Sequence, residues 1–271
     1  MKILFADLDG TLLDNESKVS DYSIDVIRRM TASGHKFVLA SGRPLDSILE
    51  VKRLAGLDMP GVYITANNGS LIYDCDRGVT IYKDPVPLDR VKRIWDTAHD
   101  MDVHIQTYTE NAVITAKDDA EIRKYTVKIH IPILYTDDPL TVLTEAPSKM
   151  LAISLTDSDK LERFRQRVLT EHSDILDALY SEPEYLEIYS RTAGKGKALI
   201  WLCDHLGVSI EDSYAAGDAM NDISMIEAAG HGIVMCNASD DVKEHADIIT
   251  EYSNDEDGLA RVILDRIMGE A

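Results

Sequence analysis

The sequence KILFADLDGTL, residues 2–12, carries the strongest signal in this chain. Its first part, residues 2–6, is a short apolar run, which predicts a buried β-strand. Asp7 and Asp9 follow directly, and Gly10 allows the chain to turn sharply after them. Ligands bind beyond the carboxyl ends of the strands in an open parallel sheet, so both carboxylates are expected in one pocket. Crowded carboxylates repel one another, and the motif therefore indicates a nearby cation, although a solvated Asp-Gly turn has the same sequence.

Strand and helix patterns alternate on the C-terminal side of this motif. Ser20 is expected to cap a helix that ends at Gly34. The apolar runs that predict further strands are 37–40, 62–65, 71–73, 214–216, 232–235 and 248–249. Further helices are predicted up to about residue 55, over 197–206, after 221 and from about 259. Such alternation predicts an α/β fold with a Rossmann-like, doubly wound parallel sheet as its core.

The pattern changes near Pro85 and Pro87. From there to about Tyr189, helices alternate with short runs rich in β-branched and aromatic residues. These runs occupy 103–108, 112–116, 150–155 and 185–189. We interpret the stretch as an inserted α+β cap domain. The expected domains are therefore a core domain formed by 1–84 and 190–271, and a cap formed by 85–189.

The composition excludes several classes of partner. The formal net charge is −20 at pH 7, whereas nucleic acids and anionic membranes bind basic surfaces, so neither is expected as a partner. The three cysteines lack C-x-x-C spacing, and the first apolar run is too short for a signal peptide. Both features favour a cytoplasmic protein with reduced thiols. The acidic run 254–257 is expected to be a solvated loop.

A second acidic motif, GDAMND at residues 217–222, also follows an apolar run. Asp218 is expected at the end of a strand, with Asp222 four residues later on the same face of a helix. Mg²⁺ prefers oxygen ligands, usually one or two carboxylates together with water and substrate phosphate. The motif therefore indicates Mg²⁺ as the cation, although Asn221 and Asp222 would also suit the start of a helix.

Two further polar segments are weaker signals. Ser41, Gly42 and Arg43 follow a predicted strand, where a hydroxyl and backbone N–H groups could hold phosphate oxygens. A Ser-Gly turn before a helix is, however, common. The segment GKGK at 194–197 could neutralise a carboxylate and a phosphate together, but loop lysines of this kind are usually solvated.

Together, these segments resemble the haloacid dehalogenase (HAD) phosphatases over essentially the whole chain. The insertion between Gly69 and Lys195 is similar to the large C2 cap of the Cof-like, sugar-phosphatase group. Lys195 fits the family lysine better than Lys197 does. Asn68 fits the phosphate-contacting asparagine better than Asn67 does.

The resemblance implies a mechanism. Asp7 would attack phosphorus and form an aspartyl-phosphate, while Asp9 would protonate the leaving oxygen and then deprotonate water. Mg²⁺ would be the cofactor, held by Asp7, the Asp9 backbone carbonyl and Asp218, with Asp222 mostly in support. The groups implied in phosphate binding are Thr11, Ser41, Gly42, Asn68, Lys195 and Asn221. The cap would close over the site, exclude water and select the leaving group.

The expected substrate is a small phosphorylated metabolite such as a sugar phosphate. Cap residues that could read its leaving group are Tyr108, Arg123, Tyr125 and Glu187. A phosphomutase that protects the same intermediate from water is one alternative. A catalytically silent regulatory binding protein is another, but the chain keeps the residues that catalysis would need. Neither the physiological substrate nor the oligomeric state follows from the sequence.

Overall fold

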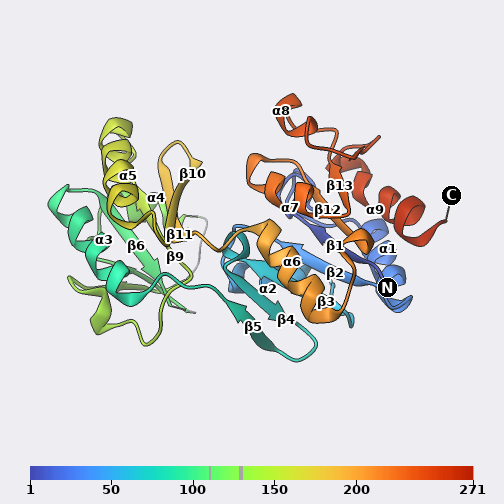
Figure 1. The fold of residues 1–271 in the computed structure, drawn as a ribbon, viewed down its shortest axis with the longest axis horizontal. Coiled ribbons are helices and arrows are strands. Elements are labelled where there is room, and N and C mark those ends of the chain that lie inside the picture. Colours follow the sequence, from blue (N-terminus) through green and yellow to red (C-terminus); the bar gives the residue numbers. More distant parts are fainter. Residues whose placement is uncertain (110, 128–130, 271) are drawn as a thin grey trace. The chain divides into compact units, whose positions relative to one another are not determined.

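The computed structural model describes residues 1–109, 111–127 and 131–270. The chain divides into two compact units, Met1–Tyr82 with Gly194–Ala271, and Lys83–Ala193 (Figure 1). The second unit begins two residues before the insertion expected at 85–189 and ends four residues after it. The first unit is therefore assembled from two stretches that are far apart in the sequence.

An eight-stranded sheet forms the centre of the first unit. Its strands are β1 (Ile3–Ala6), β2 (Lys36–Ala40), β3 (Val62–Ala66), β4 (Leu71–Asp74), β5 (Val79–Lys83), β12 (Ser213–Gly217), β13 (His231–Val234) and β14 (Ile248–Ile249). Their order is β14-β13-β12-β1-β2-β3-β4-β5. β1 pairs in parallel with β2 on one side and with β12 on the other. The predicted parallel α/β core is confirmed, and only the edge departs from it, where β4 runs antiparallel to β3.

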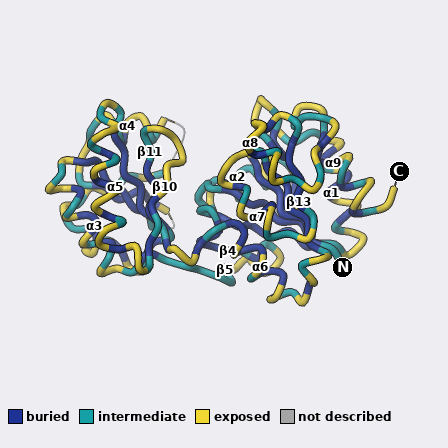
Figure 2. The backbone as a smooth tube through the Cα atoms, turned by 45° about the horizontal axis from the view of Figure 1, so that its top comes forward, coloured by how far each residue is buried: buried dark blue, intermediate teal, exposed yellow. Residues whose placement is uncertain are grey.

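Helices cover both faces of this sheet. The helices are α1 (Asp21–Ala32), α2 (Leu45–Leu54), α6 (Lys195–Leu206), α7 (Ile223–Ala228), α8 (Asp240–Lys243) and α9 (Gly258–Val262), which continues as a π-helix over Ile263–Met268. Side chains alternate along β1, so Leu4 and Ala6 pack in a core with α1, α2 and α9. Ile3 and Phe5 pack in a second core with α6 and α7. Strands β1, β3 and β12 in the middle of the sheet are accordingly buried along their length, as is visible in the buried centre of this unit (Figure 2).

Local signals account for one helix end and fail at another. Ser20 caps α1 as predicted, because its Oγ accepts a hydrogen bond from the Ser23 N–H at 3.0 Å. α6 begins at Lys195, two residues before the predicted start at 197. Gly196 lies in its first turn, and a Cβ there would overlap the Ser224 carbonyl oxygen. Close packing of α6 on α7 thus outweighs the poor helix propensity of glycine.

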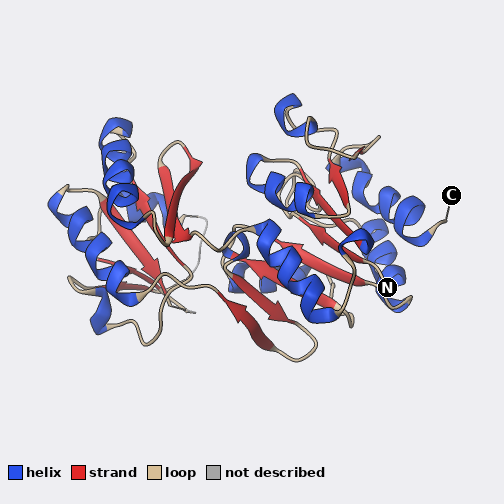
Figure 3. Cartoon of the chain, viewed as in Figure 1, coloured by secondary structure: helices blue, strands red, loops and turns tan. Residues whose placement is uncertain are grey.

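The second unit is an α+β domain with a six-stranded sheet (Figure 3). Its strands are β6 (His104–Tyr108), β7 (Val113–Thr115), β8 (Ile133–Tyr135), β9 (Lys149–Ile153), β10 (Leu176–Glu182) and β11 (Tyr185–Ser190), in the order β10-β11-β9-β6-β7-β8. Its helices are α3 (Leu88–Asp100), α4 (Ala120–Thr126) and α5 (Ser158–His172). α3 and α5 share one core with the apolar side chains of this sheet, among them Ile105, Met150 and Ile188. The alternate positions, such as Gln106, Lys149 and Glu187, carry polar side chains on the other face.

Within the ranges that the structure describes, every helix is too short or too polar to cross a membrane.

Candidate active site

Asp7 follows β1 directly, and its side chain is nearly buried. Its backbone N–H donates to the Ala216 carbonyl of β12 at 2.9 Å, which continues the parallel pairing past the end of the strand. Burial raises the pKa of Asp7 to about 7, even though the Lys195 ammonium acts to lower it. Burial therefore opposes ionisation of this carboxyl group, and a neighbouring cation favours it.

Lys195 supplies one such cation. Its Nζ donates to Asp7 Oδ1 and to Asp222 Oδ1, both at 2.6 Å, and the side chain is 1% exposed. Burial acts to lower the pKa of Lys195, but the two carboxylates overcome this effect and raise the pKa above its usual value. Lys197, the alternative that the sequence offered, is exposed. The lysine in contact with Asp7 is thus Lys195.

Asp218 and Thr11 form the next part of the site. Thr11 Oγ1 donates to Asp218 Oδ1 at 3.0 Å. Burial raises the pKa of Asp218 to about 6, although this hydrogen bond opposes the rise. Gly10 has a φ of 79°, and a Cβ at this position would overlap the Asp218 carboxylate. Only glycine allows the turn after Asp9 to approach Asp218 so closely.

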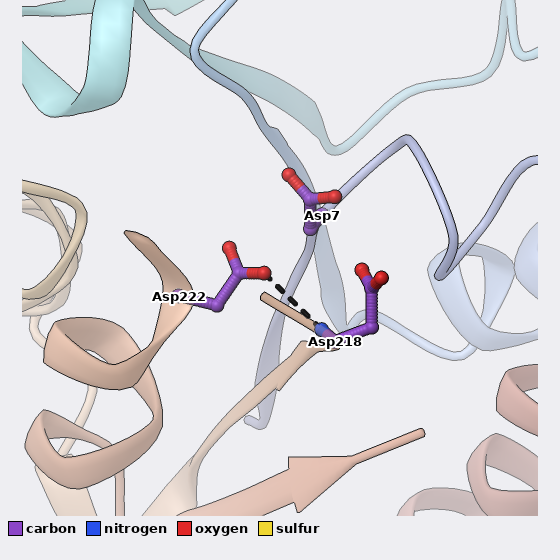
Figure 4. Close-up of side chains that lie close together, drawn as sticks. All are labelled: Asp7, Asp218 and Asp222. Carbon is purple, nitrogen blue, oxygen red and sulfur yellow. Dashed lines mark hydrogen bonds between the residues drawn. The ribbon is translucent and has the colours of Figure 1, made fainter. Parts of the chain in front are cut away.

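Asp222 is fully buried, and its carboxylate links Lys195 to the backbone at Asp218 and Ala219. Its Oδ2 accepts the N–H groups of Asp218 and Ala219, both at 3.1 Å, while its Oδ1 accepts the Lys195 ammonium. Figure 4 shows the first of these backbone contacts. Two acceptor sites of Oδ2 are therefore already used, so Asp222 is suited to orient its neighbours more than to bind a metal directly.

Asp7 and Asp218 could accept a metal ion with Asp222 in support, since one oxygen from each of the three lies within 4.8 Å of the others (Figure 4). All donors are carboxylate oxygens, which suit a hard cation such as Mg²⁺. The raised pKa values of Asp7 and Asp218 indicate that a positive charge would relieve the cost of burying two anions. The residues present therefore fit the magnesium ion that the sequence implied.

Asp9 lies beside this cluster but has a different partner. Both oxygens of its carboxylate accept hydrogen bonds from Arg43, from Nε at 2.9 Å and from Nη2 at 2.5 Å. The Asp9 side chain is 57% exposed, in contrast to Asp7. In the sequence, Arg43 stands out only as the last residue of the Ser41–Gly42–Arg43 segment, and no local pattern links it to Asp9. One signal could have predicted this contact. Arg43 follows β2, which is the neighbour in the sheet of β1, the strand that Asp9 follows.

The residues expected to bind phosphate come mostly from loops of the first unit that follow different strands: Thr11 follows β1, Ser41 and Gly42 follow β2, Asn68 follows β3, and Asn221 follows β12. The Asn68 N–H donates to the Ser41 carbonyl at 3.1 Å, and the Asn221 amide donates to Asn68 Oδ1 at 3.3 Å. Asn67 and Asn68 both have positive φ, at 50° and 53°. A Cβ at Gly42 would lie 3.0 Å from Asn68 Oδ1, so glycine allows the loop after β2 to lie close to the loop after β3. The structure thus brings Ser41, Gly42, Asn68 and Asn221 together.

Of the four residues expected to read the leaving group, Tyr108, Tyr125 and Glu187 lie in one cluster and Arg123 lies apart from it. Tyr108 OH donates to Tyr125 OH at 2.8 Å, and the Lys149 ammonium lies over the Tyr108 ring and 3.2 Å from Glu187 Oε1. Lys149 was not singled out in the sequence. Arg123 is not part of this cluster, because its 68% exposed side chain pairs with Asp118.

A cavity of about 350 Å³ lies elsewhere in the second unit, lined by Trp95, His99 and His104 among others. Several of its polar groups already pair with one another or with the backbone. His104 Nδ1 lies 2.8 Å from Asp119 Oδ2, and Trp95 Nε1 donates to the Asp137 carbonyl. None of its lining residues belongs to the carboxylate cluster, so this cavity is separate from the candidate active site.

Comparisons with known proteins agree with this geometry. The family model of the haloacid dehalogenase-like hydrolases matches residues 4–263. A 5-amino-6-(5-phospho-D-ribitylamino)uracil phosphatase of Bacillus subtilis is 32% identical and aligns over 100% of this chain and 99% of its own. A pyridoxal phosphate phosphatase of Escherichia coli is 27% identical over 98% of this chain and 99% of its own.

Solved structures give the same result for the fold. A haloacid dehalogenase-like hydrolase from Bacteroides thetaiotaomicron superposes with a TM-score of 0.88 at 31% identity. The match covers 98% of this chain and 99% of that one, so both units have counterparts in it.

Proposed function

The chain belongs to the haloacid dehalogenase-like hydrolases, and we propose that within this family it is a magnesium-dependent phosphatase of small phosphate monoesters. The observation that carries the proposal is the buried contact of Lys195 with Asp7 at the end of β1, beside Asp218. A nucleophile, a fixed cation and a carboxylate set suited to Mg²⁺ are what phosphoryl transfer through an aspartate requires.

In the proposed reaction, an oxygen of Asp7 attacks phosphorus, and the bond between phosphorus and the leaving-group oxygen breaks. Asp9 donates a proton to that oxygen. Asp9 then takes a proton from water, the water oxygen attacks phosphorus, and the bond to Asp7 breaks to release inorganic phosphate. Bound Mg²⁺ would supply charge neutralisation at the phosphoryl oxygens.

The other residues position the reacting groups. Lys195 would favour the ionised form of Asp7 and remain beside the phosphoryl charge. Arg43 holds Asp9 as a carboxylate through two hydrogen bonds, so this contact must open before a protonated Asp9 can donate to the leaving group. Asp218 would join Asp7 as a ligand of the metal, with the Asp9 backbone carbonyl as a third ligand and Asp222 in support. The remaining groups would hold phosphoryl oxygens: Thr11, Ser41, Gly42, Asn68 and Asn221.

We infer that the substrate is a small phosphorylated metabolite, with sugar phosphates as the first class to examine. The net charge of −20 disfavours polyanionic partners such as nucleic acids. Two relatives named for their substrates act on phosphate esters of small molecules. The inserted cap would select the leaving group, and the Tyr108, Tyr125, Lys149 and Glu187 cluster offers hydroxyl, cationic and anionic groups for that purpose.

The test is release of inorganic phosphate from a panel of phosphorylated sugars and other metabolites in the presence of Mg²⁺. Asp7→Asn should abolish release while the melting temperature stays close to wild type, because the variant lacks the attacking oxygen. Activity of this variant near the wild-type level would contradict the proposal. Transfer of phosphate between positions of a sugar, without release, would instead indicate a mutase.

A further inference from the structure

The turn that carries Asp9 is held by two asparagines that the proposed mechanism does not use. Asn237, after β13, donates from Nδ2 to the Gly10 carbonyl at 2.8 Å. Asn254, after β14, donates from Nδ2 to the Leu13 carbonyl at 2.8 Å. The two asparagines also contact each other, since the Asn254 N–H donates to Asn237 Oδ1 at 3.3 Å. One connected amide pair thus holds two carbonyls of the same turn.

The segment that presents Asn254 is itself well defined. Residues 254–257 were expected to form a solvated loop, and Asp255 and Glu256 are exposed, but Asp255 and Asp257 also make hydrogen bonds to distant residues. Asp255 Oδ1 accepts the Asn15 N–H at 2.8 Å, and Asp257 Oδ1 accepts the Ser23 hydroxyl at 2.9 Å. The acidic run therefore docks on the chain that follows the Asp9 turn, which no local pattern could reveal.

Gly10 explains why the turn needs outside support. A side chain at this position would overlap Asp218, so only glycine fits. Glycine, however, leaves the peptide planes on both sides of its Cα free to rotate, and one of these planes contains the Asp9 carbonyl. Asn237 fixes the other plane through the Gly10 carbonyl. Leu13, whose carbonyl Asn254 holds, forms a β-bridge with Asp9 itself.

We propose that Asn237 and Asn254 are positioning residues for Asp9, a role that rests on the proposed function of Asp9 as proton donor. They restrict the Asp9–Gly10 backbone so that the carboxyl group reaches the leaving-group oxygen. Asp7 is fixed independently by β12 and Lys195, so the asparagines affect proton donation more than nucleophilic attack. Loss of their hydrogen bonds should therefore lower kcat/KM most for an ester whose leaving group needs a proton.

The experiment compares two esters with and without the asparagine contacts. p-Nitrophenolate is a stable anion and leaves almost without protonation, whereas an alkoxide needs a proton as it leaves. Asn237→Ala should lower kcat/KM about tenfold for an alkyl phosphate and less than about threefold for p-nitrophenyl phosphate. Asn237→Asp keeps the acceptor for Asn254 but loses the donor to Gly10, so it should give the same pattern.

The control is Asn15→Ala. Among the residues that the structure describes, the Asn15 side chain bonds to Asp255 and not to the Asp9 turn, so the variant should leave kcat/KM unchanged for both esters. Asp9→Asn marks the full size of the leaving-group effect, and melting temperatures check the fold of each variant. If Asn237→Ala lowered kcat/KM equally for both esters, or left both unchanged as Asn15→Ala should, the positioning role would be overturned while the phosphatase proposal stood. A wild-type protein inactive toward every ester would overturn both.

Discussion

Lys195 allows Asp7 and Asp222 to be buried side by side, because it contacts both carboxylates at 2.6 Å. Removing one member of a buried ion pair leaves an uncompensated charge, which typically costs about 3–5 kcal/mol. The same cation would stabilise the transferred phosphoryl group. We therefore expect Lys195 to matter for both stability and turnover.

The matched test uses the two lysines of the GKGK segment. Lys195→Ala should lower kcat roughly 10²–10³-fold, because it removes a fixed charge beside the reacting phosphoryl group. Lys197→Ala should change kcat less than about twofold, since its side chain is exposed. Steady-state kinetics on the best ester measures both. The opposite ranking would show that the wrong lysine has been assigned.

Proton release should accompany Mg²⁺ binding. The pKa values of Asp7 and Asp218 are raised to about 7 and about 6, so the metal-free site holds protons that a cation must displace. Affinity for Mg²⁺ should therefore fall as the pH drops from 8 to 5 and level off above about 7.5. Calorimetry in buffers of different ionisation enthalpy would count the protons. A pH-independent affinity would contradict this assignment.

At the scale of elements, the contact between α6 and α7 sets the position of Lys195. Gly196, the next residue, has no room for a side chain, because a Cβ would overlap the Ser224 carbonyl. Its N–H also donates to Ser224 Oγ at 3.3 Å. The helix that carries the lysine is thus fixed against the helix that follows Asp222.

A substitution at Gly196 separates helix propensity from packing. Alanine stabilises an isolated helix by about 1 kcal/mol relative to glycine. In this protein we expect Gly196→Ala to destabilise by about 1–3 kcal/mol, because backbone atoms must move apart. Ile200→Ala, at an exposed position of the same helix, should change stability far less. Thermal or chemical unfolding measures both, and a more stable Gly196→Ala variant would refute the packing argument.

At the scale of the whole molecule, the chemistry and its selectivity are expected to belong to different units. The proposed nucleophile, the carboxylate cluster and the groups proposed to contact phosphate all come from residues before 82 or after 194. The inserted unit has its own core and carries a cluster of paired polar and aromatic side chains on its second sheet face. Binding energy from such remote groups can be used at the reacting centre.

This division predicts that cap variants alter substrate preference without altering the metal requirement. Glu187→Gln and Tyr125→Phe should change kcat/KM unequally across phosphate esters, by about tenfold for the most affected ester. The Mg²⁺ concentration for half activation should stay within about twofold, because the proposed metal ligands lie in the other unit. Arg123→Ala, whose side chain extends into solvent, serves as the comparison. A uniform loss on every ester would show that the cap does not read the leaving group.

The parallel core and its acidic motifs were accessible from the sequence, because these signals are local. A buried strand needs only a few consecutive apolar residues, and the motif that follows it lies at the ligand-binding edge of the sheet. Asp7 and Asp218 follow β1 and β12, which are neighbours in the sheet, and the family pattern supplied that pairing in advance. The start of α6 was misplaced because glycine propensity is a weaker effect than packing on α7.

The contacts between distant residues were decided only by the tertiary structure. Arg43 reaches Asp9 across 34 residues, and Asn237 reaches the Gly10 carbonyl across 227. Two further contacts also join residues that are far apart in the sequence. Asp255 in the acidic run 254–257 accepts the Asn15 N–H, and Asp222 accepts the Lys195 ammonium. No periodicity or short motif encodes such pairs, because each depends on strand order and on loop geometry set by the whole first unit. The sequence therefore determined which chemistry is present, and packing determined which residues orient it.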